Sequence, residues 1–421
     1  MNVGLLDLGC VRNTVDSQDL LASFARKGHR ITSVENADVV VVNTCSFIED
    51  AKRESIDAIL GLVDLKRKGR IKKIVVAGCL SQRYGAVLVP ELKEVDAFIG
   101  VQKLRKDSRQ APAVLTPAYS SYLRISESCL HQCSFCIIPK LKGRFVSRRM
   151  SAVLKDAEAM ALLGVREINV IGQDVTAYGL DLYKRRALAD LLRRIVRRVP
   201  DVPWIRLLYA HPSHVTDDLL DAMARGKRIC RYLDIPLQHV SDRVLKMMGR
   251  GTTHIKTVAL LEKARRRVPG MALRTAFIVG FPGETEKDFR ELLRFIEENP
   301  FDHVGVFTYS REEGTAAYRL KGQVPRAVRQ ERYERLMEAQ AQVLQGLHHS
   351  RIGTESEVLI EKRAEGRMDR YWGRSPWDAP DVDGGVFVES RRRLIPGMMV
   401  RVRILGDEGY DLRGEVVDER A

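Results

Sequence analysis

Apolar runs alternate with amphipathic segments in the amino-terminal part of the chain. The runs have the length of buried strands and span residues 3–8, 38–42 and 73–77. Residues 16–27 and 49–65, which lie between them, carry apolar side chains at helical spacing. Because strand–helix alternation favours a parallel sheet with helices on its faces, we predict an amino-terminal parallel α/β domain over residues 1–112.

The central part of the chain alternates in the same way. Its strand candidates give six strand–helix units and span residues 122–125, 166–171, 204–208, 232–236, 273–279 and 304–309. A long, charged, amphipathic helix is predicted over residues 325–351, and we expect it to pack back on these units. We assign residues 115–345 to a second α/β domain.

The pattern changes after the long helix. Residues 352–421 hold short alternating apolar runs, separated by Gly and Pro, at 356–360, 386–388, 398–404 and 414–417. Short strands of this kind are typical of a small antiparallel β-barrel, which we predict as the third domain.

Composition narrows the class of protein. The chain has 421 residues and is 45% hydrophobic, enough for about three domains. None of its apolar runs approaches the roughly 20 residues of a membrane span. Its amino terminus lacks the basic region and cleavage site of a secretory signal. We therefore expect a cytoplasmic protein with no membrane partner, whose seven cysteines favour metal binding over disulfides.

The net charge of +15 is unevenly distributed. Residues 1–112 carry +4, residues 113–350 carry +13 and residues 351–421 carry −2. A basic central domain fits a partner rich in phosphate, such as RNA or a ribonucleoprotein. Ordinary solubility charge explains the same numbers, so the charge alone does not name the partner.

Three cysteines stand close together in the order Cys-x-x-x-Cys-x-x-Cys, at Cys129, Cys133 and Cys136. Three thiolates in one loop can hold three corners of an iron–sulfur cube, and its fourth iron is then open to a small molecule. Electron-transfer ferredoxins close their clusters with a fourth cysteine, so an open iron indicates chemistry. Two alternatives stay open: a zinc site with His131 as fourth ligand, and three buried small side chains.

Three more cysteines each follow a predicted strand of the first domain. Cys10, Cys45 and Cys79 are separated by 35 and 34 residues, about one strand–helix unit each. The carboxyl ends of parallel strands meet at one sheet edge, where open α/β sheets bind ligands. We expect the three thiols to converge there, although three separate core cysteines remain the alternative. Cys230 has no such context and is interpreted as a core residue.

The central cysteine spacing resembles that of the radical S-adenosylmethionine (SAM) enzymes. The resemblance implies an open (β/α)6 partial barrel, a [4Fe–4S] cluster at the central cysteines and SAM on its open iron. It places Phe135 beside the adenine of SAM. Reactive groups belong at the carboxyl ends of such strands. The remaining residues that we expect to bind the cofactor lie there: Gly172, Gln173, Asp174, Gln238, Gly280 and Gly283.

The short motifs around the first three cysteines resemble the amino-terminal domain of the methylthiotransferases, a radical-SAM subgroup. They read Leu-Gly-Cys-Val-Arg-Asn at 8–13, Asn-Thr-Cys-Ser-Phe-Ile at 43–48 and Ala-Gly-Cys at 77–79. The resemblance implies a second [4Fe–4S] cluster at Cys10, Cys45 and Cys79, whose open iron handles the sulfur to be inserted. It also implies that the last domain is a substrate-binding TRAM domain.

Within this family the chain resembles the RimO branch, which modifies an aspartate of small-subunit ribosomal protein twelve. The matching stretches are residues 13–17, 136–140, 172–179, 378–384 and 410–412. Ser128 and Leu130 depart from the family's usual Gly and Asn, which puts the loop conformation in doubt. The acidic balance of the last domain fits a basic protein partner. We expect Asp378, Asp381 and Asp383 to contribute to that binding, unless they only form a turn around Pro380.

The resemblance implies the following reaction. A radical generated from SAM removes hydrogen from the β-carbon of the aspartate, sulfur joins that carbon, and a second SAM methylates the sulfur. No protein side chain is assigned a catalytic role, because the clusters carry the chemistry. An electron donor such as flavodoxin or ferredoxin and a sulfur donor are implied as partners. The alternatives are a tRNA methylthiotransferase acting on a modified adenosine and a non-enzymatic iron–sulfur RNA-binding sensor.

Overall fold

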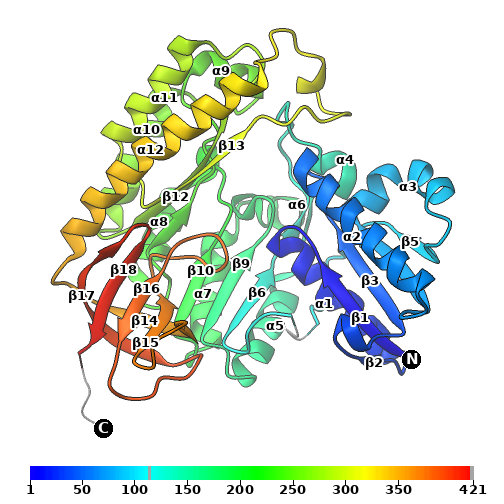
Figure 1. Ribbon diagram of the computed structural model, residues 1–421. Coiled ribbons are helices and arrows are strands. Elements are labelled where there is room, and N and C mark those ends of the chain that lie inside the picture. The colour runs from blue at the N-terminus through cyan, green and yellow to red at the C-terminus, as the bar shows by residue number, and fades with distance from the viewer. Residues whose placement is uncertain (112–114, 418–421) are drawn as a thin grey trace.

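A computed structural model describes residues 1–111 and 115–417, and Figure 1 shows their arrangement. The amino-terminal region is a five-stranded parallel sheet of order β2-β1-β3-β4-β5. Its strands are β1 (Asn2–Asp7), β2 (Arg30–Ile31), β3 (Val39–Thr44), β4 (Lys73–Gly78) and β5 (Ala97–Ile99). Its helices are α1 (Val11–Arg26), α2 (Glu49–Arg67) and α3 (Cys79–Glu91). The predicted parallel α/β fold is confirmed here.

Both faces of this sheet are covered. Val40 and Val42 of β3 pack with Ile59 and other apolar residues of α2. On the opposite face, Val39 and Val41 pack with residues of α1. A strand that is buried on both faces is continuously apolar instead of alternating, which explains the four consecutive valines of β3.

The central region holds six parallel strands in two three-stranded sheets of order β10-β9-β6 and β11-β12-β13. The strands are β6 (Ser120–Arg124), β9 (Glu167–Ile171), β10 (Trp204–Leu207), β11 (Tyr232–Asp234), β12 (Ala272–Val279) and β13 (His303–Thr308). One parallel bridge, between Ile205 and Ile229, links the two sheets. All six predicted strands are confirmed, and β6 and β13 are the edges of an open arrangement.

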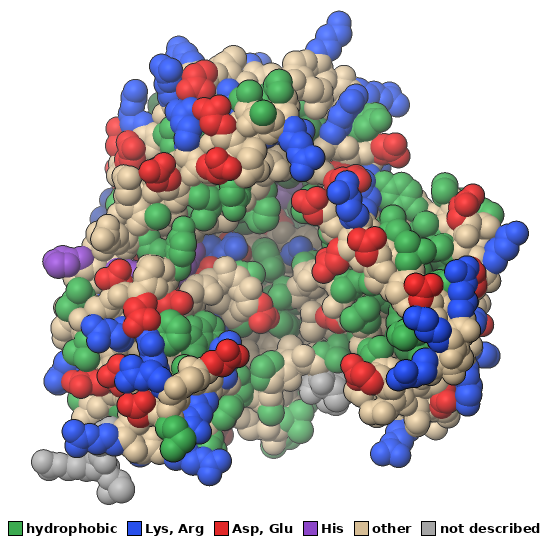
Figure 2. All heavy atoms as spheres, viewed as in Figure 1, with side chains coloured by type: hydrophobic (Ala, Val, Ile, Leu, Met, Phe, Trp, Pro, Cys, Tyr) green, Lys and Arg blue, Asp and Glu red, His purple; other side chains and the backbone are tan. Residues whose placement is uncertain are grey.

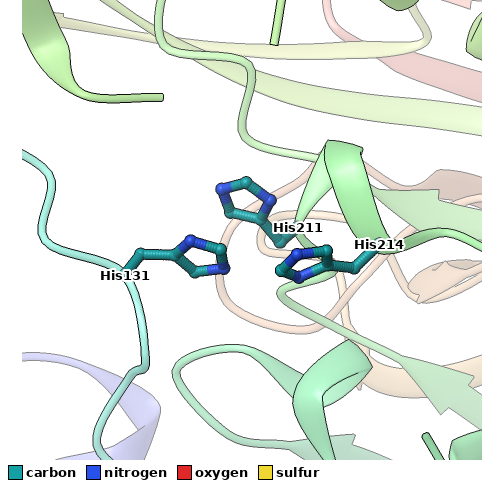
Figure 3. A group of neighbouring side chains, drawn as sticks. All are labelled: His131, His211 and His214. Carbon is teal, nitrogen blue, oxygen red and sulfur yellow. The ribbon is translucent and has the colours of Figure 1, made fainter. Parts of the chain in front are cut away.

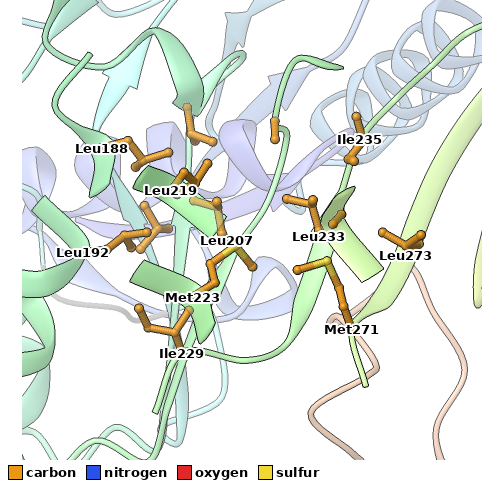
Figure 4. Close-up of a cluster of buried hydrophobic side chains, with 14 of the residues drawn as sticks. Leu188, Leu192, Leu207, Leu219, Met223, Ile229, Leu233, Ile235, Met271 and Leu273 are labelled. Carbon is orange, nitrogen blue, oxygen red and sulfur yellow. The ribbon is translucent and has the colours of Figure 1, made fainter. Parts of the chain in front are cut away.

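Helices pack on the outer face of these strands. The longer ones are α5 (Met150–Leu162), α7 (Leu188–Arg198), α8 (Asp217–Arg225), α10 (His254–Arg267), α11 (Glu286–Glu298) and α12 (Arg326–Arg351). Figure 4 shows Leu188 and Leu192 of α7 and Leu219 of α8 beside Leu207 and Leu233 of the strands. Short elements near the strand ends are β7 (Ser126–Glu127), α4 (Ile138–Lys142), β8 (Val146–Ser147), α6 (Leu180–Tyr183) and α9 (Asp242–Met248).

The carboxy-terminal region is a closed five-stranded barrel of order β14-β15-β16-β18-β17. Its strands are β14 (Glu355–Arg363), β15 (Arg370–Arg374), β16 (Val386–Glu389), β17 (Met399–Glu408) and β18 (Asp411–Val416). The barrel was predicted, but β15 was not, because it begins and ends with arginine. The pairing of β16 with β18 is parallel, whereas the other pairs are antiparallel as expected.

The barrel is fixed to the central sheet by a buried ion network. Arg374, at the end of β15, donates to the carboxylate of Glu167 at the start of β9, with an Nη1–Oε1 distance of 3.0 Å. Arg206 of β10 donates to the same carboxylate at 2.9 Å. All three side chains are fully buried. A charge removed from water needs partners of this kind, so the barrel and the sheet are joined through these residues.

The prediction that Asp378, Asp381 and Asp383 form an acidic binding surface is wrong for Asp378 and Asp383, whose side chains are buried. Asp383 accepts hydrogen bonds from Tyr232 Oη at 2.6 Å and from Arg274 Nε at 3.1 Å. Asp378 caps the backbone of Ser375, whereas Asp381 stays exposed while it accepts a hydrogen bond from Tyr122 Oη at 2.7 Å. These carboxylates therefore attach the segment around Pro380 to the strands of the central region, which is close to the turn-forming alternative.

The amino-terminal region contacts both edges of the open central arrangement. Arg124 of β6 pairs with Asp16 and with Asp19 of α1, the latter at 2.7 Å. Beyond β13, Glu312 pairs with Arg83 of α3 at 2.8 Å and with Lys52 of α2 at 3.2 Å. Figure 2 shows a hollow between the regions on this side of the molecule. Among the described helices, none is long and apolar enough to cross a membrane.

Candidate functional site: two facing cysteine trios

The central cysteines lie in a loop between β7 and α4 that its neighbours hold in place. Ser134 donates its backbone N–H to Met248 O at 2.9 Å and its hydroxyl to Met247 O at 2.8 Å, both in α9. The carbonyl of Ser134 accepts from Ala317 N at 2.7 Å. Gly249 ends α9 with φ +70, and a Cβ there would lie 3.3 Å from Gln132 O, so this close approach favours glycine. The loop is thus shaped by two segments distant in sequence, the end of α9 and the turn at Ala317.

The thiols of this loop are partly buried and have few polar partners. Burial raises the pKa of Cys129 to about 12 and that of Cys136 to about 11. The thiol of Cys133 lies 3.6 Å from Nη1 of Arg250. Thiols with raised pKa values stay protonated at neutral pH unless a metal displaces the protons, and the neighbouring arginine favours a negatively charged metal–thiolate group.

The zinc alternative fits this geometry poorly. A single zinc ion holds its thiolates at about 2.3 Å, which brings the sulfurs within about 3.8 Å of one another. In the described residues, the group whose three ligand atoms all lie within 4.8 Å is a histidine trio, not either cysteine trio. His131, the proposed fourth ligand, instead directs Nε2 to Asp174 Oδ2 at 3.1 Å. The sulfur atoms within each cysteine trio are spaced more widely than a single zinc ion requires, and this spacing suits a cluster of several irons.

The amino-terminal cysteines converge as predicted. Cys10 is the N-cap of α1 after β1, Cys45 follows β3, and Cys79 begins α3 after β4. Gly9 has φ +100, and a Cβ there would lie 2.8 Å from the Cβ of Cys45. The chain after β1 is therefore in close contact with the chain after β3. Burial raises the pKa of Cys45, and it raises that of Cys79 to about 12. Cys45 and Cys10 also act on the thiol of Cys79, so the structure brings the three cysteines together at this sheet edge.

The two trios face each other. Cys79 belongs to one buried apolar cluster with Ile137, which directly follows Cys136, and with Leu141 of α4. Lys142, at the end of α4, pairs with Asp16 at 2.7 Å and with Glu127 at 3.5 Å. The short helix α4 thus ties the central cysteine loop to the helix that carries the last cysteine of the other trio.

The predicted residues after β9 lie beside the central loop. The backbone oxygen of Gly172 accepts from Arg12 Nη1 at 3.4 Å, and a Cβ on Gly172 would lie 2.5 Å from Ser126 Oγ. Gln173 Nε2 donates to Glu127 Oε1 at 2.5 Å. Asp174 caps the turn η2 (Val175–Ala177). Although burial alone would raise it, the pKa of Asp174 is held well below its usual range by hydrogen bonds, the largest of them from His131.

The other residues predicted to bind the cofactor lie in the central cysteine loop and around β12. Phe135 packs in an apolar cluster with Phe281, Tyr309 and Met248. Gln238 has φ +74, and its backbone bonds to Ala276 and Ile278 of β12.

Gly280 and Gly283 form the turn after β12. A Cβ on Gly280 would lie 2.0 Å from the side chain of Arg329, which covers this glycine. The N–H of Gly283 donates to Gly322 O at 2.7 Å. These two glycines therefore shape the turn that carries Phe281 toward the central loop.

A histidine group beside the loop was missed by the sequence reasoning. His211 and His214 lie in the turn η3 (Pro212–His214) and its N-cap after β10, and Figure 3 shows His131 reaching across to them. The rings of His131 and His211 are stacked, with centroids 3.7 Å apart and an interplanar angle of 10°. Nε2 of His131 and Nδ1 of His214 lie 3.1 and 3.5 Å from Oδ2 of Asp174, so this carboxylate holds the group in place as a wall of the site. Burial lowers the pKa of His211 to about 2, which keeps it neutral.

Cys230 belongs to neither trio. It precedes β11 at the opposite ends of the strands and is 4% exposed in an apolar cluster with Tyr232 and Trp204. Burial raises the pKa of its thiol to about 11. This agrees with its interpretation as a core residue, and it leaves each trio with three thiols.

Comparison with protein families gives three consecutive matches. Residues 2–100 match the uncharacterized protein family UPF0004, residues 123–296 match the radical SAM superfamily, and residues 352–417 match the TRAM domain. The matched segments correspond to the parallel sheet, the six-stranded region and the closed barrel.

Whole-chain relatives are more specific. The chain is 46% identical to the ribosomal protein uS12 methylthiotransferase RimO of Caldanaerobacter subterraneus, over 98% of this chain and 99% of the relative. It is 45% identical to the protein of the same name from Pelotomaculum thermopropionicum, over 99% of both. Among solved structures, the radical SAM methyltransferase TsrM from Kitasatospora setae shares the fold, with a TM-score of 0.55 and 17% identity over 75% of this chain and 76% of that one.

Proposed function

The chain belongs to the family of ribosomal protein uS12 methylthiotransferases RimO, and we propose that it attaches a methylthio group to the β-carbon of an aspartate of uS12. The observation that carries the proposal is the pair of cysteine trios that meet across α4. One trio explains the radical chemistry of the superfamily. A second trio within reach of the first supplies a place for the sulfur that the product contains.

We assign Cys129, Cys133 and Cys136 to a [4Fe–4S] cluster that binds SAM, as the radical SAM match implies. The raised pKa values of Cys129 and Cys136 and the arginine beside Cys133, Arg250, fit such a group. When bound, this group supplies a carbon radical able to remove hydrogen from a C–H bond too weakly acidic for a protein base. We assign Cys10, Cys45 and Cys79 to a second [4Fe–4S] cluster.

The chain's own residues position and enclose the reactants. We propose that Phe135, Gln238 and the Gly172–Asp174 stretch line the SAM site, with Gly280 and Gly283 shaping the turn beside it. His131 and its stacked neighbours wall the site off on one side. The ion pairs of Arg124 and Glu312 hold the amino-terminal region over the opening, which excludes water from a reactive radical.

The remaining assignments concern partners and domains. We propose uS12, free or in the ribosome, as substrate, with a flavodoxin or ferredoxin as electron donor, a separate sulfur donor, and the bacterial cytoplasm as location. We keep residues 1–112, 115–345 and 352–421 as the three domains, with boundaries at 112 and 421 outside the described residues. The last of them binds the substrate through surfaces other than the buried carboxylates of Asp378 and Asp383.

An anaerobic assay with two substrates tests the proposal. The reconstituted protein, SAM, a sulfide source and a reductant are incubated in parallel with uS12 and with tRNA that lacks the methylthio group. We expect a methylthio aspartate in uS12 and no change in the tRNA. Modified tRNA would favour the tRNA methylthiotransferase, and failure to cleave SAM would favour the RNA-binding sensor.

A further inference from the structure

Arg12 extends from the amino-terminal region into the mouth of the central strands. It lies in the first turn of α1, two residues after Cys10. Its guanidinium lies over the ring of Tyr209, with the central carbon 4.6 Å from the ring centroid, and Nη1 donates to Gly172 O at 3.4 Å. Tyr209 and Gly172 follow β10 and β9. One side chain therefore connects the strand ends of two regions.

The position of Arg12 lies between the two cysteine trios. Its guanidinium interacts with the thiol of Cys10, and its charge acts on Cys45 of the same trio and on Cys136 of the other. Because a guanidinium is always charged, Arg12 puts a positive charge in the space where both clusters would act.

Arg12 differs from the buried arginines around it in what it binds. Arg124 pairs with Asp16 and Asp19, and Arg274 pairs with Asp234 at 3.1 Å. In the described part of the chain, no carboxylate lies within 4.0 Å of the nitrogens of Arg12, and Glu127 acts on it only from a greater distance. The direct partners of Arg12 are a carbonyl, a thiol and an aromatic ring. A guanidinium offers five donors in a fork that matches a carboxylate, and here most of them are not used by the protein.

The proposed substrate supplies a carboxylate that can contact Arg12 directly. The β-carbon of aspartate is bonded directly to its carboxylate carbon, so a group that fixes the carboxylate also fixes the carbon that loses hydrogen. A carboxylate brought into a partly buried site beside six thiolates requires a cation. Building on the proposed function, we propose that Arg12 binds the side-chain carboxylate of the substrate aspartate and thereby positions its β-carbon between the two clusters.

Peptide binding to the reconstituted protein tests this inference. Two peptides from uS12 are compared, one with the target aspartate and one with asparagine at that position, by their dissociation constants. A charge-assisted pair of hydrogen bonds predicts that the unaltered protein prefers the aspartate peptide by at least about tenfold. Arg12→Gln should reduce this preference to about twofold or less, and Arg12→Lys should keep an intermediate preference. Iron content, measured in parallel, should not change.

The control and the opposing outcomes are defined by the same measurements. Arg197→Gln removes one positive charge from the exposed face of α7 and should leave the preference intact. A preference that survives in Arg12→Gln would overturn the inference, as would an unaltered protein that does not distinguish the peptides. Loss of iron from both Arg12 variants would also overturn it, because the guanidinium would then serve the thiolates. If the unaltered protein modifies uS12 in these cases, the proposed function still stands.

Discussion

Arg374 of the carboxy-terminal barrel and Glu167 of the central sheet form an ion pair in which both side chains are fully buried. Their Nη2–Oε2 distance is 2.5 Å, and Arg206 donates to the same carboxylate from the other side. The barrel is therefore a fixed part of the molecule and not a loosely tethered module. If the barrel binds the substrate, as proposed, it does so through a surface held at a constant position relative to the cysteine trios.

Breaking this pair should destabilise the protein strongly. Arg374→Met leaves Glu167 buried with one partner fewer, which typically costs about 3–5 kcal/mol. We expect a clear fall in the midpoint of urea unfolding. Arg401→Met removes an exposed partner of Glu355 and should change stability by less than about 1 kcal/mol. Equal effects of the two substitutions would show that the buried pair does not hold the barrel.

The carboxylate of Asp383 should affect stability and not charge-dependent substrate binding. Asp383→Asn weakens bonds to Tyr232 and Arg274 and should cost about 2 kcal/mol. Glu365→Gln, at an exposed position, is the control. Dissociation constants for uS12 at two salt concentrations distinguish the alternatives. If Asp383→Asn bound uS12 more weakly and with less dependence on salt, while its stability stayed unchanged, Asp383 would be part of a binding surface.

His303 should make barrel docking dependent on pH. Although burial alone would lower it, Asp383 and Asp378 raise the pKa of His303 to about 9. Because this is above the unfolded value of about 6.5, the stabilisation is fully present below about pH 6.5 and is lost as the pH rises toward 9.

The expected loss, up to about 3 kcal/mol, is measured as the free energy of unfolding between about pH 6 and pH 9.5. His303→Gln should remove this part of the pH dependence. Identical pH profiles for the two proteins would show that His303 is not charged in the folded state.

The two cysteine trios should have separable roles. Reconstitution should give about eight irons per chain if two cubes form. Replacing Cys10, Cys45 and Cys79 with Ala should leave about four irons and production of 5′-deoxyadenosine, but no methylthiolated aspartate. Replacing Cys129, Cys133 and Cys136 should abolish SAM cleavage. Cys230→Ala is the matched control and should keep all irons. Full product from the first triple variant would refute the second cluster.

Local pattern was sufficient to predict most of the strands and the six clustered cysteines. Runs such as Val39–Val42 are apolar because both faces of the strand are buried, and a thiol at a strand end needs no tertiary information to be noticed. The same reasoning passed over His211 and His214, although they follow β10 at an equivalent position. Applying the strand-end rule to every strand would have identified them.

Contacts between regions could not be predicted from the sequence. In the sequence, Arg12 is an ordinary polar residue in the first turn of a predicted helix. Only the contact between the amino-terminal and central regions brings it over the ring of Tyr209. Asp383 reads as a surface acid near Pro380, yet its partners Tyr232 and Arg274 are more than one hundred residues away. Contacts between residues so far apart in the sequence depend on how the folded regions are placed relative to one another. The hydrophobic periodicity of a sequence carries no information about that placement.

The central claim is tested most directly by mass spectrometry of uS12 from bacteria that carry this chain and from the same strain without it. The account predicts that the target aspartate carries CH3S in place of one hydrogen in the first strain and is unmodified in the second. Restoring the chain should restore the modification, whereas the variant lacking Cys10, Cys45 and Cys79 should not. A uS12 that is modified equally in both strains would contradict the proposed function.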